Sequence, residues 1–367
     1  MKVPVRRMRE ASVEIRSYVF LPIDRVIYGP GSITRLPEEV ERIGATRVTV
    51  TTTGSIARGT ALLAQVRDLL GDRVVAVYAG VRQHTPSSAV TELCKELKAS
   101  EAELVVSLGG GSVIDATKAA VLAVARDTGS FLPHIAVPTT LSASEFSPLF
   151  GVTDESTKAK AGGDNPFVTP RVAILDAELT RDTPDWLWTS SGIRAVDHAV
   201  ETVYAPDHGP VTDATALEAI RLLFQYLPES RSKDAVHERQ QCQLAAWLSF
   251  FGVENITLGP SHLLGRQIGP RYDVPHGYTS AVLLPRVMEA LLPETAARQA
   301  LVAWAAGAAP RDASPEDAAQ AAPAAVRDLV SHLDLPHTLQ ELGVPEEDLD
   351  HLSAGRVDIR SILQAAW

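Results

Sequence analysis

Strand-like and helix-like segments alternate through the first half of the chain, and the alternation then stops. The strand-like segments are rich in β-branched and aliphatic residues, and helical spacing follows two of them, at 60–70 and 87–99. The expected strands are 47–52, 73–78, 104–108, 135–137 and 172–175. Strands separated by helices pair in parallel and are buried on both faces. The first half is therefore predicted to be an α/β domain built around a parallel sheet.

Beyond residue 176 the strand-like runs nearly disappear, and alanine, leucine and glutamate become frequent. The alanine-rich stretch 296–330 is predicted to be two ordered helices joined by a loop at 309–315, because its apolar residues keep a helical spacing. The other expected helices are 192–204, 211–226, 235–251, 261–267 and 279–292. The second half is therefore predicted to be all-helical.

The change of pattern places a domain boundary near residue 177. We expect an α/β domain at 18–177 and a helical domain at 178–367. Residues 1–17 carry several basic side chains but no apolar stretch of the kind that a secretory signal needs. They are predicted to form a flexible basic extension.

Charge and composition exclude several classes of partner. The formal net charge is -11, and a negative field repels phosphate backbones, so no nucleic acid is expected as a partner. No apolar run reaches the length of a membrane span, so no membrane is expected either. Cys94 and Cys242 are too few for a disulfide framework, and we expect buried thiols in a reducing cytoplasm.

Three glycines follow the expected strand 104–108 and open a helix. Glycines let a backbone approach a phosphate closely, and a helix N-terminus supplies free N–H groups and the positive end of the helix dipole. Gly110, Gly111 and Ser112 therefore form a candidate pyrophosphate site at the carboxyl end of a parallel strand. The segment is neither a GxGxxG motif nor a P-loop, so a simple tight turn is the alternative.

A cluster of hydroxyl side chains follows the next expected strand, 135–137. Thr139, Thr140, Ser142 and Ser144 lie within six residues. Hydroxyls in this position can bind a ribose or a pyrophosphate. The alternative is a turn rich in serine and threonine that caps the next helix.

Three histidines lie in the helical half, at His198, His262 and His276. A histidine on a helix is usually structural, but three in one domain can converge on a metal ion or on a reacting carbonyl group. No two of them are three or four residues apart, so their spacing does not by itself show that they converge.

Taken together, these motifs are similar to those of the iron-containing alcohol dehydrogenase family, which has the dehydroquinate-synthase-like fold. Within that family the chain most resembles maleylacetate reductases, and the resemblance extends over nearly the whole chain from Tyr18. The shared motifs are Tyr28-Gly-Pro-Gly31, Gly109-Gly-Gly-Ser112, Pro138-Thr-Thr140, the segment 192–201 and the 14-residue step from His262 to His276.

The resemblance implies a Rossmann-like nucleotide-binding domain at 18–177, a helical substrate domain at 178–367 and an active site between them. It implies NAD(H) or NADP(H) as the cofactor, and a homodimer. Gly110, Gly111 and Ser112 would hold the pyrophosphate. Thr139, Thr140 and Ser142 would line the ribose and adenine side, and Lys160 would lie near the nicotinamide end.

The resemblance also sets an expectation about metal. Metal-using members of the family bind an ion through an Asp and three His. The chain has the three histidines, but Arg194 stands at the Asp position. A divalent ion about 5 Å from a guanidinium would be repelled by roughly 6–7 kcal/mol at an effective dielectric constant of about 20. Asp197 is expected to face another direction on the same helix and not to replace the missing ligand. We therefore expect no metal.

Two further departures concern the substrate pocket. Arg266 stands where maleylacetate reductases usually have a second histidine, and Gly277 stands where they usually have alanine. Arg194 and Arg266 are therefore candidate anchors for a carboxylate or phosphate of the substrate. The alternative for Arg194 is an ion pair with Asp197 or Glu201 on its own helix.

The expected reaction is hydride transfer to a small anionic carbonyl or enoate substrate. Arg194, Lys160 or a protonated histidine would meet the charge that develops on oxygen, and His198, His262 or His276 would deliver the proton. Three hypotheses remain open: a metal-free enzyme similar to maleylacetate reductase, a reductase of the same family for another anionic carbonyl in a biosynthetic pathway, and a member that has lost hydride transfer and performs non-redox acid–base chemistry or serves as a binding module.

Overall fold

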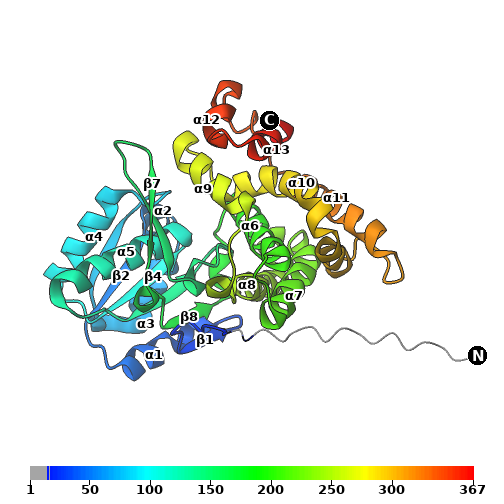
Figure 1. The fold of residues 1–367 in the computed structure, drawn as a ribbon. Coiled ribbons are helices and arrows are strands. Elements are labelled where there is room, and N and C mark those ends of the chain that lie inside the picture. The colour runs from blue at the N-terminus through cyan, green and yellow to red at the C-terminus, as the bar shows by residue number, and fades with distance from the viewer. Residues whose placement is uncertain (1–14, 16) are drawn as a thin grey trace, which may run out of the picture.

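The computed structural model describes Ile15 and residues 17–367, so the predicted extension at 1–17 lies almost wholly outside the described residues. An α/β half and a helical half lie side by side (Figure 1). None of the described helices is both long enough and apolar enough to cross a membrane. Cys242 is buried as expected, whereas Cys94 is only partly buried.

Within the described residues, six strands form one sheet in the order β1-β8-β5-β4-β2-β3. All neighbouring strands are parallel, which confirms the predicted α/β class. The strands are β1 (Arg25–Tyr28), β2 (Val48–Thr53), β3 (Val74–Val81), β4 (Leu104–Gly109), β5 (His134–Pro138) and β8 (Val172–Leu175). Only β1, which is short and half-exposed, was not expected from the sequence.

The two strands that follow β2 in the sequence lie on opposite sides of it in the sheet. The chain adds β3 on one side of β2 and then crosses to add β4 on the other side. The carboxyl ends of β2 and β4 therefore lie next to each other at a topological switch point, which is where open α/β sheets bind their ligands.

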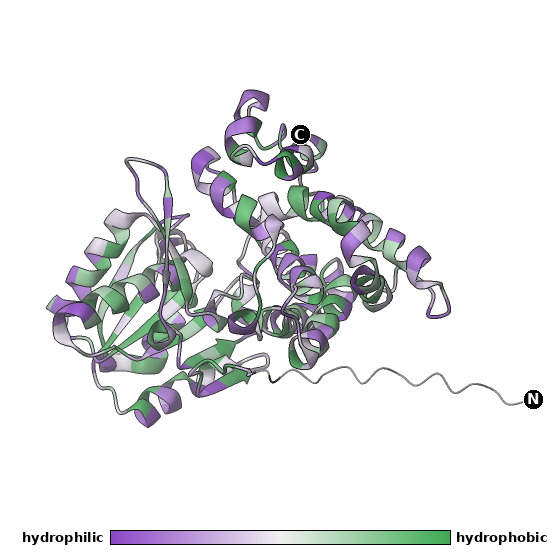
Figure 2. Cartoon of the chain, in the orientation of Figure 1, coloured by the Kyte–Doolittle hydropathy of each residue, from purple (hydrophilic) through white to green (hydrophobic). Residues whose placement is uncertain are grey.

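Helices cover both faces of the sheet, and Figure 2 shows hydrophobic residues along the central strands between them. Helical spacing was expected at 60–70, and the helix there begins at Leu62 because Thr60 is extended. The helices of this half are α1 (Leu36–Ile43), α2 (Gly54–Gly59), α3 (Leu62–Leu70), α4 (Ser87–Ala99) and α5 (Gly111–Thr128).

A separate antiparallel hairpin projects from the α/β half (Figure 1) and was not expected from the sequence. It consists of β6 (Leu149–Thr153) and β7 (Lys160–Asp164). A Cβ atom on Gly163 would lie 2.1 Å from the ring of Phe150, so the ring packs directly over the glycine backbone. The hairpin places Lys160, its first residue on β7, at the cleft between the two halves.

The half beyond residue 177 is helical as predicted, but its last two helices were not expected from the sequence and one predicted boundary needs correction. Its helices are α6 (Asp185–Tyr204), α7 (Pro210–Tyr226), α8 (Val236–Phe250), α9 (Pro260–Tyr272), α10 (His276–Ala305), α11 (Pro315–His332), α12 (Leu349–Ser353) and α13 (Val357–Ala366). The predicted interruption after residue 292 is wrong, because α10 continues through Pro285 and Pro293. Each proline removes one backbone donor, and the packing of α10 along α11 maintains the helix.

The largest apolar core belongs to both halves. Leu141, Phe146 and Leu175 come from the α/β half and pack into the same cluster as Trp188 and Val196 of α6. A polar contact reinforces this junction, because the backbone N–H of Leu141 donates to the Ser191 hydroxyl at 3.0 Å. The two halves are therefore joined by a continuous core.

Candidate active site

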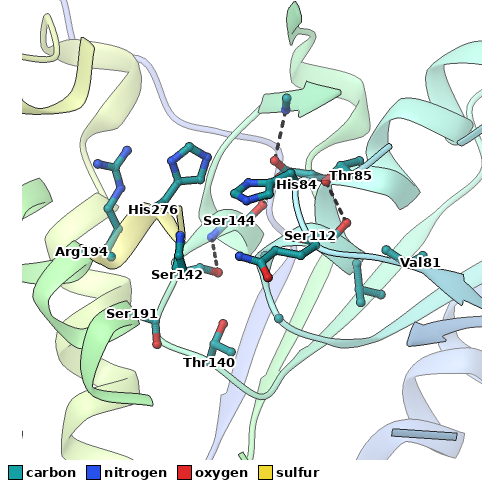
Figure 3. Close-up of a pocket in the computed structure, with 18 of the residues that line it drawn as sticks. Val81, His84, Thr85, Ser112, Thr140, Ser142, Ser144, Ser191, Arg194 and His276 are labelled. Atoms are coloured by element: carbon teal, nitrogen blue, oxygen red, sulfur yellow. Dashed lines mark hydrogen bonds between the residues drawn. The ribbon is translucent and has the colours of Figure 1, made fainter. Parts of the chain in front are cut away.

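A cleft of about 850 Å³ lies at the carboxyl ends of the strands, between the sheet and the helical half. Its walls come from the loops after β2, β3, β4 and β5, from the hairpin, and from α6, α9 and α10. Figure 3 shows Arg194 and His276 on one side and His84 and Ser112 on the other. The cleft is at the position that the topological switch point predicts.

The glycine loop forms a close-fitting cradle at the start of α5. Gly109 has φ of +150°, a conformation that favours glycine. A Cβ atom on Gly110 would lie 2.9 Å from Cγ2 of Thr140, and one on Gly111 would lie 2.8 Å from Oγ of Ser142. No side chain caps α5, an 18-residue helix. The bare backbone and free helix end suit an anion such as a pyrophosphate.

The hydroxyl cluster after β5 divides into groups that face the cleft and groups that do not. Thr140 and Ser142 line the cleft, and Oγ1 of Thr140 is a buried atom with no hydrogen-bond partner among the described residues. Thr139 is buried and is not among the residues that line the cleft. Ser144 also lines the cleft, but its hydroxyl already donates to Asp115 at 2.5 Å and accepts from Lys118 at 3.2 Å. The cradle and the unpartnered Thr140 hydroxyl fit a dinucleotide cofactor.

The three histidines line the same cleft although their spacing did not show it. His198 lies on α6, His262 on α9 and His276 at the start of α10. The rings of His198 and His262 are 4.7 Å apart, and His276 lies 5.9 Å from the ring of His84. His84 is a site residue that sequence reasoning missed, and its φ of 61° places it in the left-handed region.

Burial keeps these histidines uncharged. It lowers the pKa of His262 to about 3 and the pKa of His198 and His276 well below the usual value. Nδ1 of His198, Nε2 of His262 and Nδ1 of His276 have no hydrogen-bond partner within the described part of the chain. The histidines therefore present neutral rings, each with one unsatisfied ring nitrogen.

Arg194 is tethered on one side only. Its Nη1 donates to Oδ2 of Asp197 at 3.2 Å and to Oγ of Ser280 at 3.0 Å. The side chain is 13% exposed and lines the cleft. The expectation that Asp197 faces elsewhere is wrong, because Asp197 lies one helical turn from Arg194 and its Oδ2 is 3.6 Å from Nδ1 of His262. Arg194 therefore forms the ion pair with Asp197 that was the alternative prediction, and its guanidinium group also faces the cleft.

Sequence reasoning did not find the role of Glu201. Its carboxylate caps α9 by accepting from the backbone N–H of Gly259 and Ser261, and it lies 3.0 Å from Nδ1 of His262. Burial raises the pKa of Glu201 to about 7. The only signal in the sequence is the Gly259-Pro-Ser start of a helix, which does not identify a distant capping residue. Glu201 therefore fixes the orientation of His262.

Two further cations reach the cleft. Nζ of Lys160 lies 2.9 Å from Nε2 of His276, and burial lowers the pKa of this lysine. Arg266 is exposed on α9 and forms no ion pair with any described residue. Its Nη2 would lie 2.5 Å from a Cβ atom on Gly162, so Arg266 reaches over the hairpin. All predicted site residues except Thr139 therefore line one cleft.

Comparison with known families agrees with this architecture. Residues 23–177 match the iron-containing alcohol dehydrogenase family, and residues 188–361 match its C-terminal domain. The chain belongs to the iron-containing alcohol dehydrogenase family. It is 34% identical to a maleylacetate reductase of Pseudomonas aeruginosa over 335 residues, covering 89% of this chain and 87% of that protein.

Other members of the iron-containing alcohol dehydrogenase family have similar lengths and folds. Maleylacetate reductase 1 of Rhodococcus opacus is 31% identical over 94% of both chains. The crystal structure of a maleylacetate reductase from Agrobacterium tumefaciens superposes with a TM-score of 0.81 at 28% identity, covering 96% of this chain and 99% of that one. The chain is thus an oxidoreductase of the iron-containing alcohol dehydrogenase family.

The side chains of this member do not fit the metal that the family name implies. The Arg194 guanidinium lines the cleft together with the three histidines, and Nζ of Lys160 already contacts Nε2 of His276. Asp197, Glu201 and His262 do form a close group of possible ligands. However, Oδ2 of Asp197 and both oxygens of Glu201 accept hydrogen bonds from Arg194, serine hydroxyls or the backbone of α9. Only Oδ1 of Asp197 has no partner among the described residues. The two cations, Arg194 and Lys160, therefore disfavour a divalent ion here.

Proposed function

We propose that the chain is an NAD(P)H-dependent reductase that works without a metal ion on a small anionic carbonyl or enoate substrate, similar to maleylacetate reductases. The observation that carries the proposal is the charge of the cleft. Among the described residues that line it, Asp115 is the only carboxylate, in a protein whose net charge is -11. The cations that line it are Arg58, Arg82, Lys160, Arg194 and Arg266. Such a cleft concentrates anionic ligands.

The glycine loop supports the cofactor assignment. Gly110, Gly111 and Ser112 would hold the pyrophosphate through backbone N–H groups and the N-terminus of α5. Thr140 and Ser142 would bind the adjoining sugar. Reduced nicotinamide, when bound, supplies the hydride, and the protein supplies position and electrostatic field.

Arg194 and Arg266 would hold the acidic groups of the substrate. Because Nη1 of Arg194 is fixed by Asp197 and Ser280, the guanidinium is pre-oriented, and its remaining N–H groups are available to a carboxylate. Arg266 has no competing carboxylate among the described residues. Two cations on one wall of the cleft favour a substrate that carries more than one negative charge.

Lys160 is best suited to meet the charge that develops on the substrate oxygen. The hydride adds to carbon, the displaced electron pair moves to oxygen or to the enolate, and one proton completes the reduction. Burial keeps the three histidines neutral, and it lowers the pKa of Lys160, which makes its ammonium group a stronger acid. We propose that the proton comes from Nζ of Lys160, with His276 holding the ammonium group in place.

The test is a titration of the purified protein with NADH and NADPH, followed by cofactor oxidation in the presence of maleylacetate. Turnover that survives a chelator, in a protein without bound iron or zinc, supports the proposal. Cofactor binding without turnover points to another anionic carbonyl substrate. Absence of cofactor binding contradicts hydride transfer, and about one metal ion per chain with activity lost to the chelator contradicts metal independence. The homodimer and the cytoplasmic location remain predictions.

A further inference from the structure

The carboxyl end of β2 carries a feature that the proposed reaction does not use. Thr53 ends the strand, and its hydroxyl lies 2.8 Å from the hydroxyl of Ser55. Arg58 follows one helical turn later and lines the cleft. Its Nη2 would lie 2.6 Å from a Cβ atom on Gly54, so the guanidinium folds back over the end of the strand. A cation and two hydroxyls are therefore gathered at one edge of the cleft.

Nothing among the described residues neutralises Arg58. It is exposed and takes part in no ion pair or hydrogen bond with the described side chains. Arg82, the other arginine of this region of the cleft, is by contrast bound to Glu155 at 2.8 Å and to Ser88 at 3.1 Å. The single carboxylate of the cleft lining, Asp115, is engaged with Ser144 and with the N–H of Gly151. Arg58 is thus a free anion-binding group.

The end of β2, which carries Arg58, lies next to the glycine loop. β2 is hydrogen-bonded to β4, with Thr51 opposite Ser107, and Ile56 lies within 3.4 Å of a Cβ atom built on Gly109. The end of β2, the glycine loop, Lys160 and the histidines all line one cleft. A cofactor whose pyrophosphate lies on the loop and whose nicotinamide lies at Lys160 would place its adenosine half toward the end of β2.

Sheets that bind dinucleotides distinguish the two nicotinamide cofactors at such a strand end. A carboxylate there binds the ribose hydroxyls of NAD, and it would repel a phosphate at the 2′ position. An arginine there accommodates that phosphate. In this chain the strand end carries Thr53, Ser55 and Arg58 and no carboxylate.

We propose that Arg58, with the hydroxyls of Thr53 and Ser55, forms a phosphomonoester subsite for the 2′-phosphate of NADPH, so that the protein binds NADPH in preference to NADH. The inference rests on the proposed function, since it needs a nicotinamide cofactor in the cleft. It concerns only which of the two cofactors is selected.

The experiment measures equilibrium binding by calorimetry, without substrate. We expect tighter binding of NADPH than of NADH, and of 2′,5′-ADP than of 5′-AMP. Arg58→Gln should weaken NADPH binding by about tenfold or more while NADH binding is unchanged, since only the 2′-phosphate loses its charged partner. Arg67→Gln is the matched control, because Arg67 is also exposed but lies on α3 outside the cleft lining.

A second variant reverses the preference. Thr53 accepts a hydrogen bond from the N–H of Ile56, and aspartate can make the same contact. Thr53→Asp should therefore fold, lose NADPH affinity and retain or gain NADH affinity. Equal affinities in the unaltered protein, or equal losses for both cofactors in Arg58→Gln, overturn the inference and leave the proposed function intact. If neither cofactor binds, the proposed function itself fails.

Discussion

Nη1 of Arg194 donates to Oδ2 of Asp197 across one turn of α6, at 3.2 Å, and the same carboxylate oxygen accepts from Ser261 and Ser280. The contact joins a cation at the cleft to a carboxylate that has no exposure to solvent. Arg194 therefore has two separable effects, one on substrate binding and one on stability.

Arg194→Met should lower kcat/KM by about thirtyfold or more, or about 2 kcal/mol, because a charged contact to the substrate is lost. The melting temperature should fall too, because breaking a buried pair can cost about 3–5 kcal/mol, and the two serines will reduce that cost. Arg194→Lys should restore both properties only in part, since an ammonium group has no bidentate fork. A fall in melting temperature with unchanged kinetics would leave Arg194 as an ion-pair partner alone.

Arg194→Asp should create a metal site. The variant restores the carboxylate beside His198, His262 and His276, and zinc or iron binding is expected in calorimetry and elemental analysis. Adding Lys160→Gln should tighten binding further, because it frees Nε2 of His276 from an ammonium group. If neither variant binds zinc or iron, the three histidines do not form one site.

Gly110→Val should weaken cofactor binding by about tenfold or more, about 1.4 kcal/mol, while the fold survives. A side chain at this position would enter the space between the glycine loop and Thr140. Fluorescence titration with NADH measures the effect. Gly209→Val is the control, because a Cβ atom on Gly209 meets nothing within 4 Å. Unchanged affinity in Gly110→Val would mean that the loop is only a turn.

Gly277→Ala should destabilise the protein by about 1–3 kcal/mol, the usual cost of overpacking. The added Cβ atom would lie 2.1 Å from the backbone oxygen of Ser190, so the start of α10 would have to move away from α6. Urea unfolding measures the loss. Because His276 precedes this glycine, kcat should fall as well. An unchanged midpoint would show that α10 can shift without cost.

His134 should make stability depend on pH. It is buried beside Ser107, and burial lowers its pKa to about 3. Below the ordinary pKa of about 6.5, the unfolded chain binds a proton that the native protein excludes. The free energy of unfolding should thus fall as pH drops from about 6.5 toward 3, by about 1.4 kcal/mol per unit from this residue. His134→Gln should flatten that slope in urea unfolding series, and an identical slope would contradict the assignment.

The sequence predicted the features that depend on local pattern. The β-branched runs became β2, β3, β4, β5 and β8, and the glycine run lies at the start of α5 as expected. The hairpin was missed because Gly151, Gly162 and Gly163 conceal the strand pattern, and their absent side chains make room for Lys160, Arg266 and Phe150. Glycine is depleted in strands on average, so local propensity opposes this element.

The missed parts of the site depend on contacts between distant segments. Glu201 caps a helix whose N-cap residue, Gly259, lies 58 residues later, so no local motif contains both partners. Thr139 belongs to the same hydroxyl cluster as Thr140, yet its carbonyl accepts from Thr183 and the residue is turned away from the cleft. Asp197 was expected to face away from Arg194, but residues three apart on a helix are neighbours, and the two side chains form an ion pair.

The core that Leu141, Phe146 and Leu175 share with α6 has a consequence for how the molecule responds to stress. Separating the two halves would expose apolar surface on each, at about 25 cal/mol for every Å². Neither half can therefore melt alone without weakening the other, and heat or denaturant should unfold them as one cooperative unit. A cofactor bound at the strand ends thereby protects helices that it never touches, through mass action on that single transition.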